Sequence, residues 1–394
     1  MRILVITNRF PRPAQPTVAT YNLVQAQAIA KHHEVRVIAP VPWPEEVSDL
    51  RAGRFPVREH TSFGGLRVYH PSVIYVPRLF EHRFGQQYLW SIRRVVKRVV
   101  AELRPTALFC CWAHPDGWAC VQIARELGIP IIIKVIGSDV LVATKNPRRR
   151  KLIADALSSA DGVVAVGEDL AKHVVALGVD ARRVSVVAEG VDKDVFRPGD
   201  QGEARKKLGI PAAEKTILFV GNILVTKGIK ALVEACSILK KEGRTFHCRV
   251  VGQGKDRPAM EALVLALGLA SDVTFHGSCA HRNLGDWYRA CDFLTLPSYS
   301  EGIPNVLREV ELCGRPYIAT NVGGIPEIAK PDVSRLVDPG DVVALARHMG
   351  EFLDSPPRVD PAKADARHIS PAVSGQMVVD RFQAIFEERA AKPN

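Results

Sequence analysis

The sequence contains no run of about 20 uninterrupted apolar residues, which is the length that a membrane-spanning helix requires. Its opening stretch, MRILVITNRF, has the pattern of a buried strand and lacks the layout of a signal peptide. We therefore expect a cytoplasmic protein, either free or peripheral on the inner face of the membrane.

The sequence also lacks CxxC motifs, and its clusters of Lys and Arg contain no interleaved aromatic residues. The eight cysteines include no CxxC pair, so we expect reduced packing residues and no zinc site. Aromatic residues make up 7% of the chain and are not interleaved with its clustered basic residues. Because no nucleic-acid-reading module is recognisable either, we expect no nucleic-acid partner.

Positive charge is concentrated in the first half of the chain. Residues 1–195 hold 27 Lys and Arg against 18 Asp and Glu, a balance of +9 out of the total of +11. The two densest groups are Arg93, Arg94, Lys97 and Arg98, and Lys145 with Arg148 to Lys151. Such a surface attracts anionic lipid headgroups or a phosphorylated acceptor, and it equally well describes a solvated face that keeps the protein soluble.

Short apolar runs alternate with helical patterns, which predicts α/β architecture with a doubly wound parallel sheet. At 394 residues the chain is long enough for two domains. In the first half we expect helices near 20–31 and 88–103, and mostly loops with short edge strands over 41–80. The expected strands are 2–7, 34–40, 106–111, 129–136, 161–166 and 184–187.

The apolar stripe of the helix near 88–103 has two interpretations. It has basic residues on its other side, so it has the pattern of a helix that lies on a membrane. It also fits a helix that packs on the sheet, and we favour packing because a buried strand follows immediately.

A break rich in Pro, Gly and charged residues at 196–213 predicts the hinge, and a second alternating series follows it. Its helices are expected to start near Lys227, Arg257, Asn283 and Pro304. Its expected strands are 217–221, 247–252, 272–277, 292–297, 316–320 and 334–337. The sequence thus predicts an N-terminal domain over 1–195, a C-terminal domain over 196–371, and a helix over 372–394 that returns to the first domain.

Two glutamates frame a loop and helix start in the second half. Glu301 and Gly302 precede Pro304, which we place in the first turn of a helix, and Glu309 follows inside it. Free backbone N–H groups at a helix N-terminus suit a phosphate. The segment is interpreted either as a phosphate site flanked by two carboxylates or as an ordinary helix with an acid at each end.

Two further loops follow predicted strands of the same sheet. One runs from Asn222 to Lys227 and Gly228, and the other contains Gln253, Gly254 and Lys255. Because the carboxyl ends of parallel strands share one edge, all three loops are expected to form one anion-binding surface.

Together these stretches resemble glycosyltransferase family 4, the retaining GT-B enzymes. The resemblance rests on FVGNILVTKGIKALVEA, VVGQGKDRPAMEAL and SEGIPNVLREVELCGRPYIATNVGGIPEI, and on WAHPDGWACVQIARELGIPIIIKVIGSD in the first half. It implies two doubly wound Rossmann-like domains that face each other across a cleft.

The resemblance also implies roles for individual residues. Lys227 neutralises the donor diphosphate and Glu301 lies beside the donor sugar, so these two are the expected catalytic residues. Glu309 is expected to bind the ribose hydroxyls. The expected donor-binding residues are Asn222, Gly252, Gly254, Gly302, Ile303, Pro304, Asn305 and Glu309. Lys227 and helix N-termini take the place of a divalent ion, so we expect no metal and no cofactor besides the nucleotide-sugar co-substrate.

The sequence departs from the family pattern at several positions. Asn222 stands where relatives often have arginine, and Lys255 or Arg257 would have to compensate. Ile136 replaces a frequent histidine before the GSD segment. On the acceptor side, His114 is either a ligand contact or structural, and Asp139 either lines the cleft or caps a helix.

The leading hypothesis is a retaining glycosyltransferase that moves a hexose to an acceptor saccharide, free or lipid-linked, in cell-envelope polysaccharide or glycolipid synthesis. The basic first domain favours an acceptor at an anionic membrane surface. The alternatives are a nucleotide-sugar epimerase and a degenerate, non-catalytic nucleotide-sugar binder. A glycoside hydrolase is disfavoured because the glutamates lie in a phosphate-type loop and helix.

Overall fold

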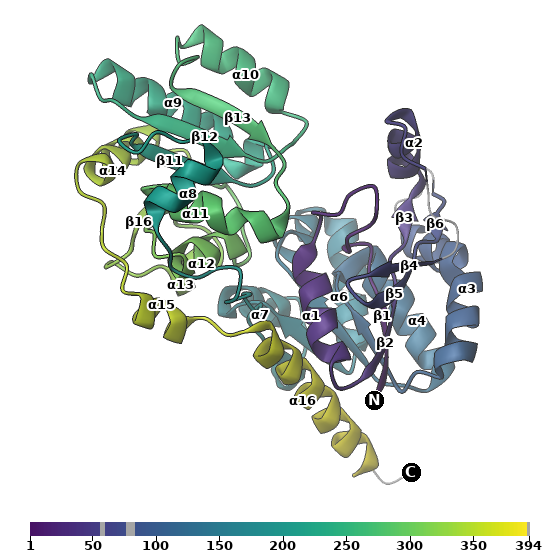
Figure 1. Ribbon diagram of the computed structural model, residues 1–394. Coiled ribbons are helices and arrows are strands. Elements are labelled where there is room, and N and C mark those ends of the chain that lie inside the picture. The colour runs from purple at the N-terminus through teal and green to yellow at the C-terminus, as the bar shows by residue number, and fades with distance from the viewer. Residues whose placement is uncertain (56–59, 76–82, 392–394) are drawn as a thin grey trace. The chain divides into compact units, whose positions relative to one another are not determined.

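The computed structural model describes residues 1–55, 60–75 and 83–391. The chain forms two compact units, the first from Met1–Gly190 with Pro371–Asn394 and the second from Val191–Ser370. The sequence had placed these boundaries at 195 and 371. Each unit is built on a mainly or wholly parallel β-sheet with helices packed on it, shown in Figure 1.

Unit 1 contains an eight-stranded sheet in the order β10, β9, β8, β7, β1, β2, β5, β4, and a two-stranded ribbon of β3 and β6. All neighbours in the large sheet are parallel except the hairpin of β4 and β5. The strands are β1 (Arg2–Ile6), β2 (Glu34–Ile38), β3 (Val41–Pro42), β4 (His60–Phe63), β5 (Leu66–Tyr69), β6 (Ser72–Val73), β7 (Ala107–Cys110), β8 (Ile131–Val135), β9 (Gly162–Ala165) and β10 (Val184–Val186).

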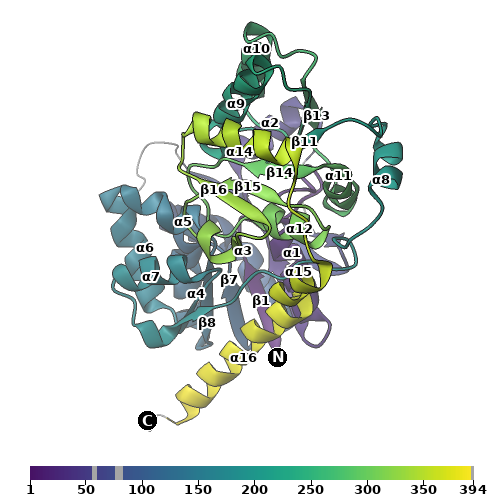
Figure 2. The same ribbon diagram turned by 90° about the vertical axis from the view of Figure 1, so that its left-hand side faces the viewer.

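Both faces of this sheet are covered, because successive side chains of a strand point to opposite faces. Ile3 and Val5 of β1 enter one apolar cluster with α1 and α16, whereas Leu4 and Ile6 enter another with α3 and α4. Figures 1 and 2 show α16 as one long helix. The helices are α1 (Thr20–Ala30), α2 (Trp43–Arg51), α3 (Phe84–Leu103), α4 (Trp118–Leu127), α5 (Ser138–Leu141), α6 (Pro147–Ser159), α7 (Glu168–Ala176) and α16 (Pro371–Ala390).

The six strands expected in unit 1 are confirmed as β1, β2, β7, β8, β9 and β10. Other expectations for this unit are refined or corrected. The stripe of α3 is buried, with Ile92 and Val99 inaccessible, so the packing interpretation of this helix holds. The segment 41–80 was predicted as loops with edge strands, yet it also contains α2. Residues 56–59 and 76–80 of that segment lie outside the described residues.

Unit 2 contains a six-stranded, entirely parallel sheet in the order β13, β12, β11, β14, β15, β16. Figure 2 shows β14, β15 and β16 side by side. The strands are β11 (Thr216–Val220), β12 (His247–Val251), β13 (Val273–Gly277), β14 (Phe293–Leu296), β15 (Tyr317–Thr320) and β16 (Ser334–Val337). The helices are α8 (Gln201–Leu208), α9 (Ile229–Lys241), α10 (Arg257–Ala266), α11 (Leu284–Ala290), α12 (Asn305–Leu312), α13 (Ile325–Ile328), α14 (Val342–Asp354) and α15 (Pro361–Arg367).

Two expectations for unit 2 were wrong. The predicted hinge 196–213 lies inside unit 2, whose first residue is Val191, and it contains α8. The Asp200 side chain caps this helix by accepting the N–H of Glu203 at 2.7 Å. Helix α12 begins at Asn305, so Pro304 precedes the helix instead of lying in its first turn.

The two sheets share one winding pattern. In unit 1, β1 lies between β2 and β7, and in unit 2, β11 lies between β12 and β14. The strand order therefore reverses beside the first strand of each unit. Ligands of such sheets bind outside the carboxyl ends of the strands at this switch point. No helix among the described residues is long and apolar enough to cross a bilayer.

A buried ion pair joins three segments of unit 1. Lys134 of β8 is inaccessible, and its Nζ lies 2.5 Å from the Glu189 carboxylate. The same ammonium donates to the side-chain oxygens of Gln25 at 2.7 Å and Asn22 at 3.1 Å. Removing one partner would leave a buried charge without compensation.

We expect Glu189→Ala to lower the free energy of unfolding by about 3–5 kcal/mol, the usual cost of stranding a buried charge. Urea denaturation of the variant checks this value. The control is Glu126→Ala, since Glu126 pairs with Arg93 at 3.1 Å with both side chains about half exposed, and this change should cost less than about 1 kcal/mol. Equal costs for the two variants would contradict the prediction.

Candidate active site

Lys227 and Glu301 meet at the switch point of unit 2. Lys227 ends the loop after β11, and Glu301 lies in the loop after β14. The lysine Nζ donates to both carboxylate oxygens, at 2.7 and 2.8 Å. Ser298 donates to the same carboxylate at 2.7 Å. The sequence therefore placed these two residues in neighbouring loops correctly, and the structure joins them in an ion pair.

Glycines allow the loops at this edge to approach one another closely. A Cβ on Gly228, whose φ is +72°, would lie 1.8 Å from the carbonyl oxygen of Pro297. A Cβ on Gly252 would lie 1.8 Å from the carbonyl oxygen of Gly221, and one on Gly254 would lie 2.1 Å from that of Ile223. Packing between loops therefore accounts for glycine at positions 252 and 254.

The N-terminus of α12 is open. Pro304 precedes the helix, and no described side chain caps it. Gly302 and Ile303 lie just before this end, and Asn305 is the first helical residue. Backbone N–H groups in the first turn of a helix have no partner within the helix and carry a partial positive charge. This end is therefore a candidate anion site, in the same loop as Glu301.

The carboxylate of Glu309 is held by two side chains from other elements. Its Oε1 lies 3.0 Å from His281 Nε2, and its Oε2 accepts the hydroxyl of Tyr288 at 2.7 Å. Glu309 is buried within α12. A carboxylate has about four lone-pair positions, so each oxygen retains one for a further donor.

His281 was not singled out by the sequence. It lies in the short turn before α11, and its ring packs edge-on against Phe196 with centroids 5.0 Å apart. Burial lowers its pKa, but the hydrogen bond to Glu309 and the charges of Glu309 and Asp192 outweigh burial and raise the pKa above 6.5. A single histidine in a loop gives no signal in a sequence, because its partner is set by tertiary packing.

Comparison with known proteins matches both units. The family of glycosyl transferases group 1 matches residues 200–368, and the glycosyl transferase 4-like domain matches residues 16–190. The chain belongs to glycosyltransferase family 4.

Curated relatives are similar over part of their length. A D-inositol 3-phosphate glycosyltransferase of Xylanimonas cellulosilytica is 35% identical over 226 residues, which are 54% of this chain and 54% of that protein. The enzyme of the same description from Mycobacterium tuberculosis H37Ra is 33% identical over 291 residues, which are 72% of this chain and 60% of that protein. The chain thus spans less than two thirds of these relatives.

Solved structures match over nearly the whole chain. Sucrose-phosphate synthase of Thermosynechococcus elongatus superposes with a TM-score of 0.75 at 20% identity, over 98% of this chain and 95% of that chain. HepE of Anabaena, in complex with UDP and glucose, superposes with a TM-score of 0.74 at 17% identity, over 97% and 99%. These likenesses establish the GT-B fold of two Rossmann-like domains.

Asn222, where relatives often have arginine, and the two residues expected to compensate for it also belong to unit 2. Asn222 and Lys255 are exposed, so neither is committed to the core. Arg257, a candidate to compensate for Asn222, donates to Glu261 at 2.8 Å. The Asp256 carboxylate accepts the N–H of Val225 at 2.9 Å and ties the loop after β12 to the loop after β11.

The switch point of unit 1 carries a buried carboxyl that the sequence did not single out. Asp116 accepts the backbone N–H of Asn8 at 2.6 Å, which joins the loops after β7 and β1. Burial raises the pKa of Asp116 to about 7. Burial likewise lowers the pKa of the neighbouring His114 to about 4, which leaves this ring neutral at pH 7.

Asp139 is engaged with backbone groups. Its Oδ1 accepts the N–H groups of Gly137 at 2.8 Å and Ile136 at 3.1 Å, and its Oδ2 accepts that of Ala113 at 3.3 Å. Asp139 lies inside α5, whose N-cap residue is Gly137 without a side-chain cap, so the helix-cap interpretation is wrong and the carboxylate instead binds N–H groups that precede the helix. Acceptor contacts of His114 and Asp139 stay predictions.

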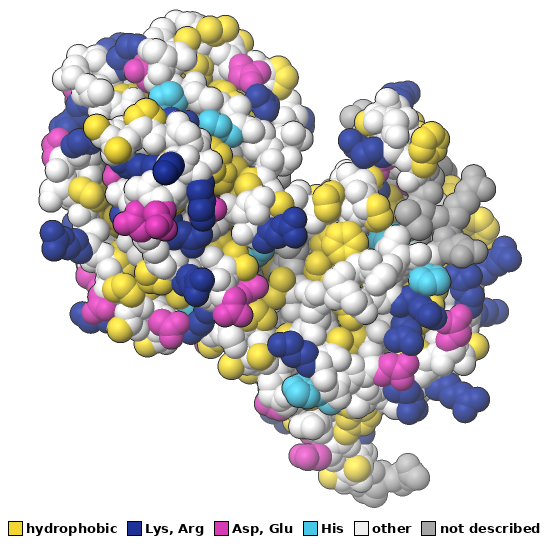
Figure 3. Space-filling model, in the orientation of Figure 1, with side chains coloured by type: hydrophobic (Ala, Val, Ile, Leu, Met, Phe, Trp, Pro, Cys, Tyr) yellow, Lys and Arg dark blue, Asp and Glu magenta, His cyan; other side chains and the backbone are white. Residues whose placement is uncertain are grey.

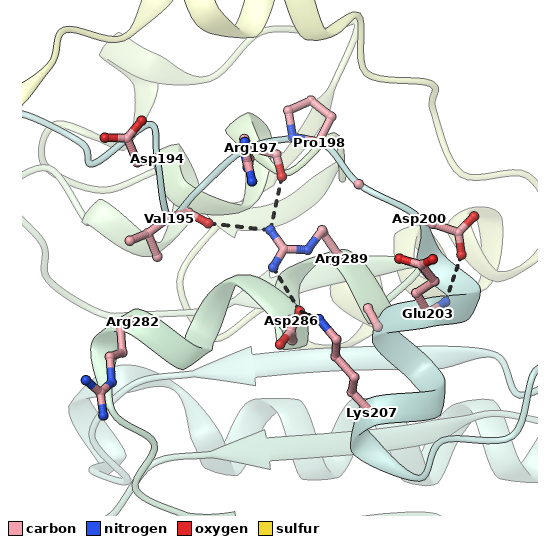
Figure 4. A pocket seen from close by; sticks show the side chains of 12 residues that line it. Asp194, Val195, Arg197, Pro198, Asp200, Glu203, Lys207, Arg282, Asp286 and Arg289 are labelled. Carbon is pink, nitrogen blue, oxygen red and sulfur yellow. Dashed lines mark hydrogen bonds and ion pairs between the residues drawn. The ribbon is translucent and has the colours of Figure 1, made fainter.

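A cavity of about 460 Å³ in unit 2 lies between segment 194–200 and helices α8 and α11, as Figure 4 shows. Arg289 crosses it and donates to the carbonyl oxygens of Val195 and Arg197 and to the Asp286 carboxylate. Lys227, Glu301 and Glu309 do not line this cavity. It is therefore distinct from the candidate anion site at α12.

The segment Asp192–Asp194, in which Lys193 separates two aspartates, has DxD spacing. Asp192 accepts the N–H groups of Asp194 at 3.0 Å and Val195 at 3.3 Å, and Lys193 pairs with Asp365 at 2.9 Å. The triplet thus forms a turn at the start of unit 2. In the part of the chain that the structure describes, no group of three His, Cys, Asp or Glu residues is arranged to hold a metal ion.

We expect the pKa of His281 to exceed 6.5 in the folded protein and to fall in Glu309→Gln, because the charge that favours the imidazolium is removed. An NMR titration of the ring measures both values. Glu261→Gln is the control, since Glu261 pairs with Arg257 instead.

The raised pKa of His281 also predicts how the stability of the fold changes with pH. Charged His281 stabilises the fold below its unfolded pKa, and this contribution is lost as the pH rises through the raised folded pKa. The difference in Tm between wild type and His281→Gln should therefore shrink with rising pH. A difference that grows over this range would contradict the pairing.

Proposed function

We propose that the protein is a retaining glycosyltransferase that moves a hexose from a nucleotide-diphosphate sugar to an acceptor hydroxyl. The observation that carries this proposal is the meeting of Lys227 with Glu301 at the switch point, beside the open N-terminus of α12. Family membership and the UDP bound by the structural neighbour HepE support a nucleotide-sugar donor.

In this proposal the donor diphosphate lies between Lys227 and the N-terminus of α12. Glu301 orients the lysine, whose ammonium has three donors and directs two toward the carboxylate. A further donor and the N–H groups near Gly302, Ile303 and Asn305 would bind phosphate oxygens. Fixed positive groups of this kind stabilise the charge that develops on the leaving diphosphate.

The ribose would lie over Glu309. His281 and Tyr288 hold the carboxylate in one orientation, and each oxygen has a lone pair left for one hydroxyl of a vicinal diol. This arrangement favours a nucleoside donor without selecting the base.

Transfer with retention needs no protein nucleophile in this proposal. The bond between the anomeric carbon and the diphosphate oxygen breaks, and the acceptor hydroxyl attacks from the same face. Its proton passes to the departing diphosphate oxygen. Positioning and electrostatic stabilisation would supply the rate enhancement, with Lys227 and the α12 dipole in the role that a metal ion fills elsewhere.

The acceptor would be a saccharide, free or lipid-linked, used in cell-envelope polysaccharide or glycolipid synthesis. Relatives described as D-inositol 3-phosphate glycosyltransferases act on an anionic acceptor by their name. The balance of +9 in residues 1–195 suits an anionic acceptor or a peripheral position on an anionic membrane.

Lys227→Ala should reduce turnover by about 10²-fold or more, the usual effect of losing one preorganised stabilising group. Release of nucleoside diphosphate from a panel of nucleotide sugars measures turnover. The matched control is Lys230→Ala, because Lys230 on α9 is more than half exposed and pairs with Glu234 at 3.4 Å.

Near-normal turnover of Lys227→Ala would overturn its assigned role. Thermal unfolding of the same variant separates a lost charge from a lost fold. An epimerase or a non-catalytic binder would give no sugar transfer with any donor in the panel, even where donors raise the Tm.

Chelation should leave turnover unchanged, because fixed cationic groups of the protein would neutralise the diphosphate. The measurement is turnover with and without EDTA on protein purified without added metal. Loss of turnover in EDTA and recovery with manganese would contradict metal independence.

A further inference from the structure

Unit 1 exposes three large apolar side chains on adjoining elements. Trp90 of α3 is 71% exposed, Ile74 after β6 is 58% exposed, and Trp43 at the start of α2 is 37% exposed. Scattered single apolar residues are normal on a surface, but a contiguous group indicates an interaction site.

Hydrogen bonds show that the segments carrying these side chains lie next to one another. The N–H of Ile74 donates to the side chain of Ser91, the residue next to Trp90, at 3.1 Å. The indole N–H of Trp43 donates to the carbonyl oxygen of Tyr75, the residue next to Ile74, at 2.7 Å. Trp43 and Trp90 therefore flank the same short segment.

Basic residues continue this surface along α3. Trp90, Arg94 and Lys97 are spaced i, i+4 and i+7, which places them on one helix face. All three are exposed, whereas Ile92 and Val99 on the other side are buried. We call Trp43, Ile74, Trp90, Arg94 and Lys97 the α3 surface.

Arg94 and Lys97 are available to a partner. Among the described residues neither has an ion-pair partner, whereas Arg93 pairs with Glu126 and Arg98 lies over the Tyr69 ring at 5.2 Å. In Figure 3, Lys and Arg side chains gather at the edge of unit 1 where α3 lies in Figure 1.

Of the acids at the start of α2, Glu45 is neutralised by a cation, whereas Glu46 keeps its negative charge. Glu45 pairs with Arg12 at 2.8 Å, and Glu46 accepts the hydroxyl of Ser72 at 2.7 Å. Exposed cations beside exposed tryptophans match the interfacial region of a bilayer, where indole rings lie at headgroup level and cations contact phosphate.

The second basic cluster lacks this combination. Arg148 to Lys151 begin α6, whose sequence PRRRKLIADALSS contains no aromatic residue. Of the two clusters, only the α3 cluster adjoins exposed tryptophan side chains among the residues described.

We propose that the α3 surface binds a bilayer that contains anionic phospholipid, with Trp90 and Ile74 in the headgroup region and Arg94 and Lys97 against phosphate groups. The inference deepens the proposed membrane-side location of the enzyme, and it does not depend on the donor chemistry assigned to unit 2.

The test is flotation of the whole chain with phosphatidylcholine vesicles, with and without phosphatidylglycerol. Binding should require phosphatidylglycerol and fall with added salt. Arg94→Glu with Lys97→Glu should weaken it at least about tenfold, since each cation near an anionic surface contributes about 1 kcal/mol. Trp90→Ser should weaken flotation both at low salt and at high salt.

Two matched variants serve as controls. Arg150→Glu with Lys151→Glu reverses the same charge on α6, and Leu265→Ser removes a 68% exposed apolar side chain from unit 2. Both should leave flotation within about twofold of wild type. Because the α6 pair changes the total charge by the same amount as the α3 pair, a loss seen only in the α3 pair depends on where the charge lies. Stabilisation of each variant by a nucleotide sugar, measured as a Tm shift, reports separately on the donor site.

Equal flotation with neutral vesicles, or loss of binding in the α6 variant alone, would overturn the proposal. So would sedimentation showing that Trp90→Ser converts a dimer to a monomer without changing flotation, because the surface would then bind a second copy. Unchanged flotation in all α3 variants would also overturn the proposal. A failed Tm shift with normal flotation would instead contradict only the donor assignment.

Discussion

The ion pair between Lys227 and Glu301 is the interaction on which the candidate site depends. It holds together the two loops on either side of the switch point in unit 2, at 2.7 and 2.8 Å. The contact between Gly228 and Pro297 brings the same loops close enough for the pair to form. The pair fixes a cation beside the open end of α12, where helix N–H groups favour a second negative charge.

Helix α12 connects this site to the rest of unit 2. Its Glu309 is held by His281 and Tyr288 from the region of α11, so one short helix carries both the candidate anion site and the held carboxylate. Two residues further on, Glu311 pairs with Arg367 and His368, close to the end of the unit. The helix is therefore fixed along its length, which suits a group that must be preorganised before a ligand arrives.

The sequence predicted the parallel strands well, because strands buried on both faces are nearly continuous apolar runs, as ILFVG and IIIKV are. It failed at α2 and α8, which are short, polar and next to prolines or glycines. Lys227 and Glu301 were predictable from their loops, since strand order brings those loops together. The contacts of Glu309 with His281 and Tyr288 were not, because they join elements whose packing no spacing rule describes.

The central claim is that a donor diphosphate binds at the switch point of unit 2, between Lys227 and the N-terminus of α12. The most direct measurement is the change in backbone amide NMR signals when UDP is added to the whole chain. The amides of Gly302, Ile303 and Asn305 should shift most, together with those near Lys227. Shifts confined to the residues around Arg289 in the separate cavity, with these amides unchanged, would contradict the claim.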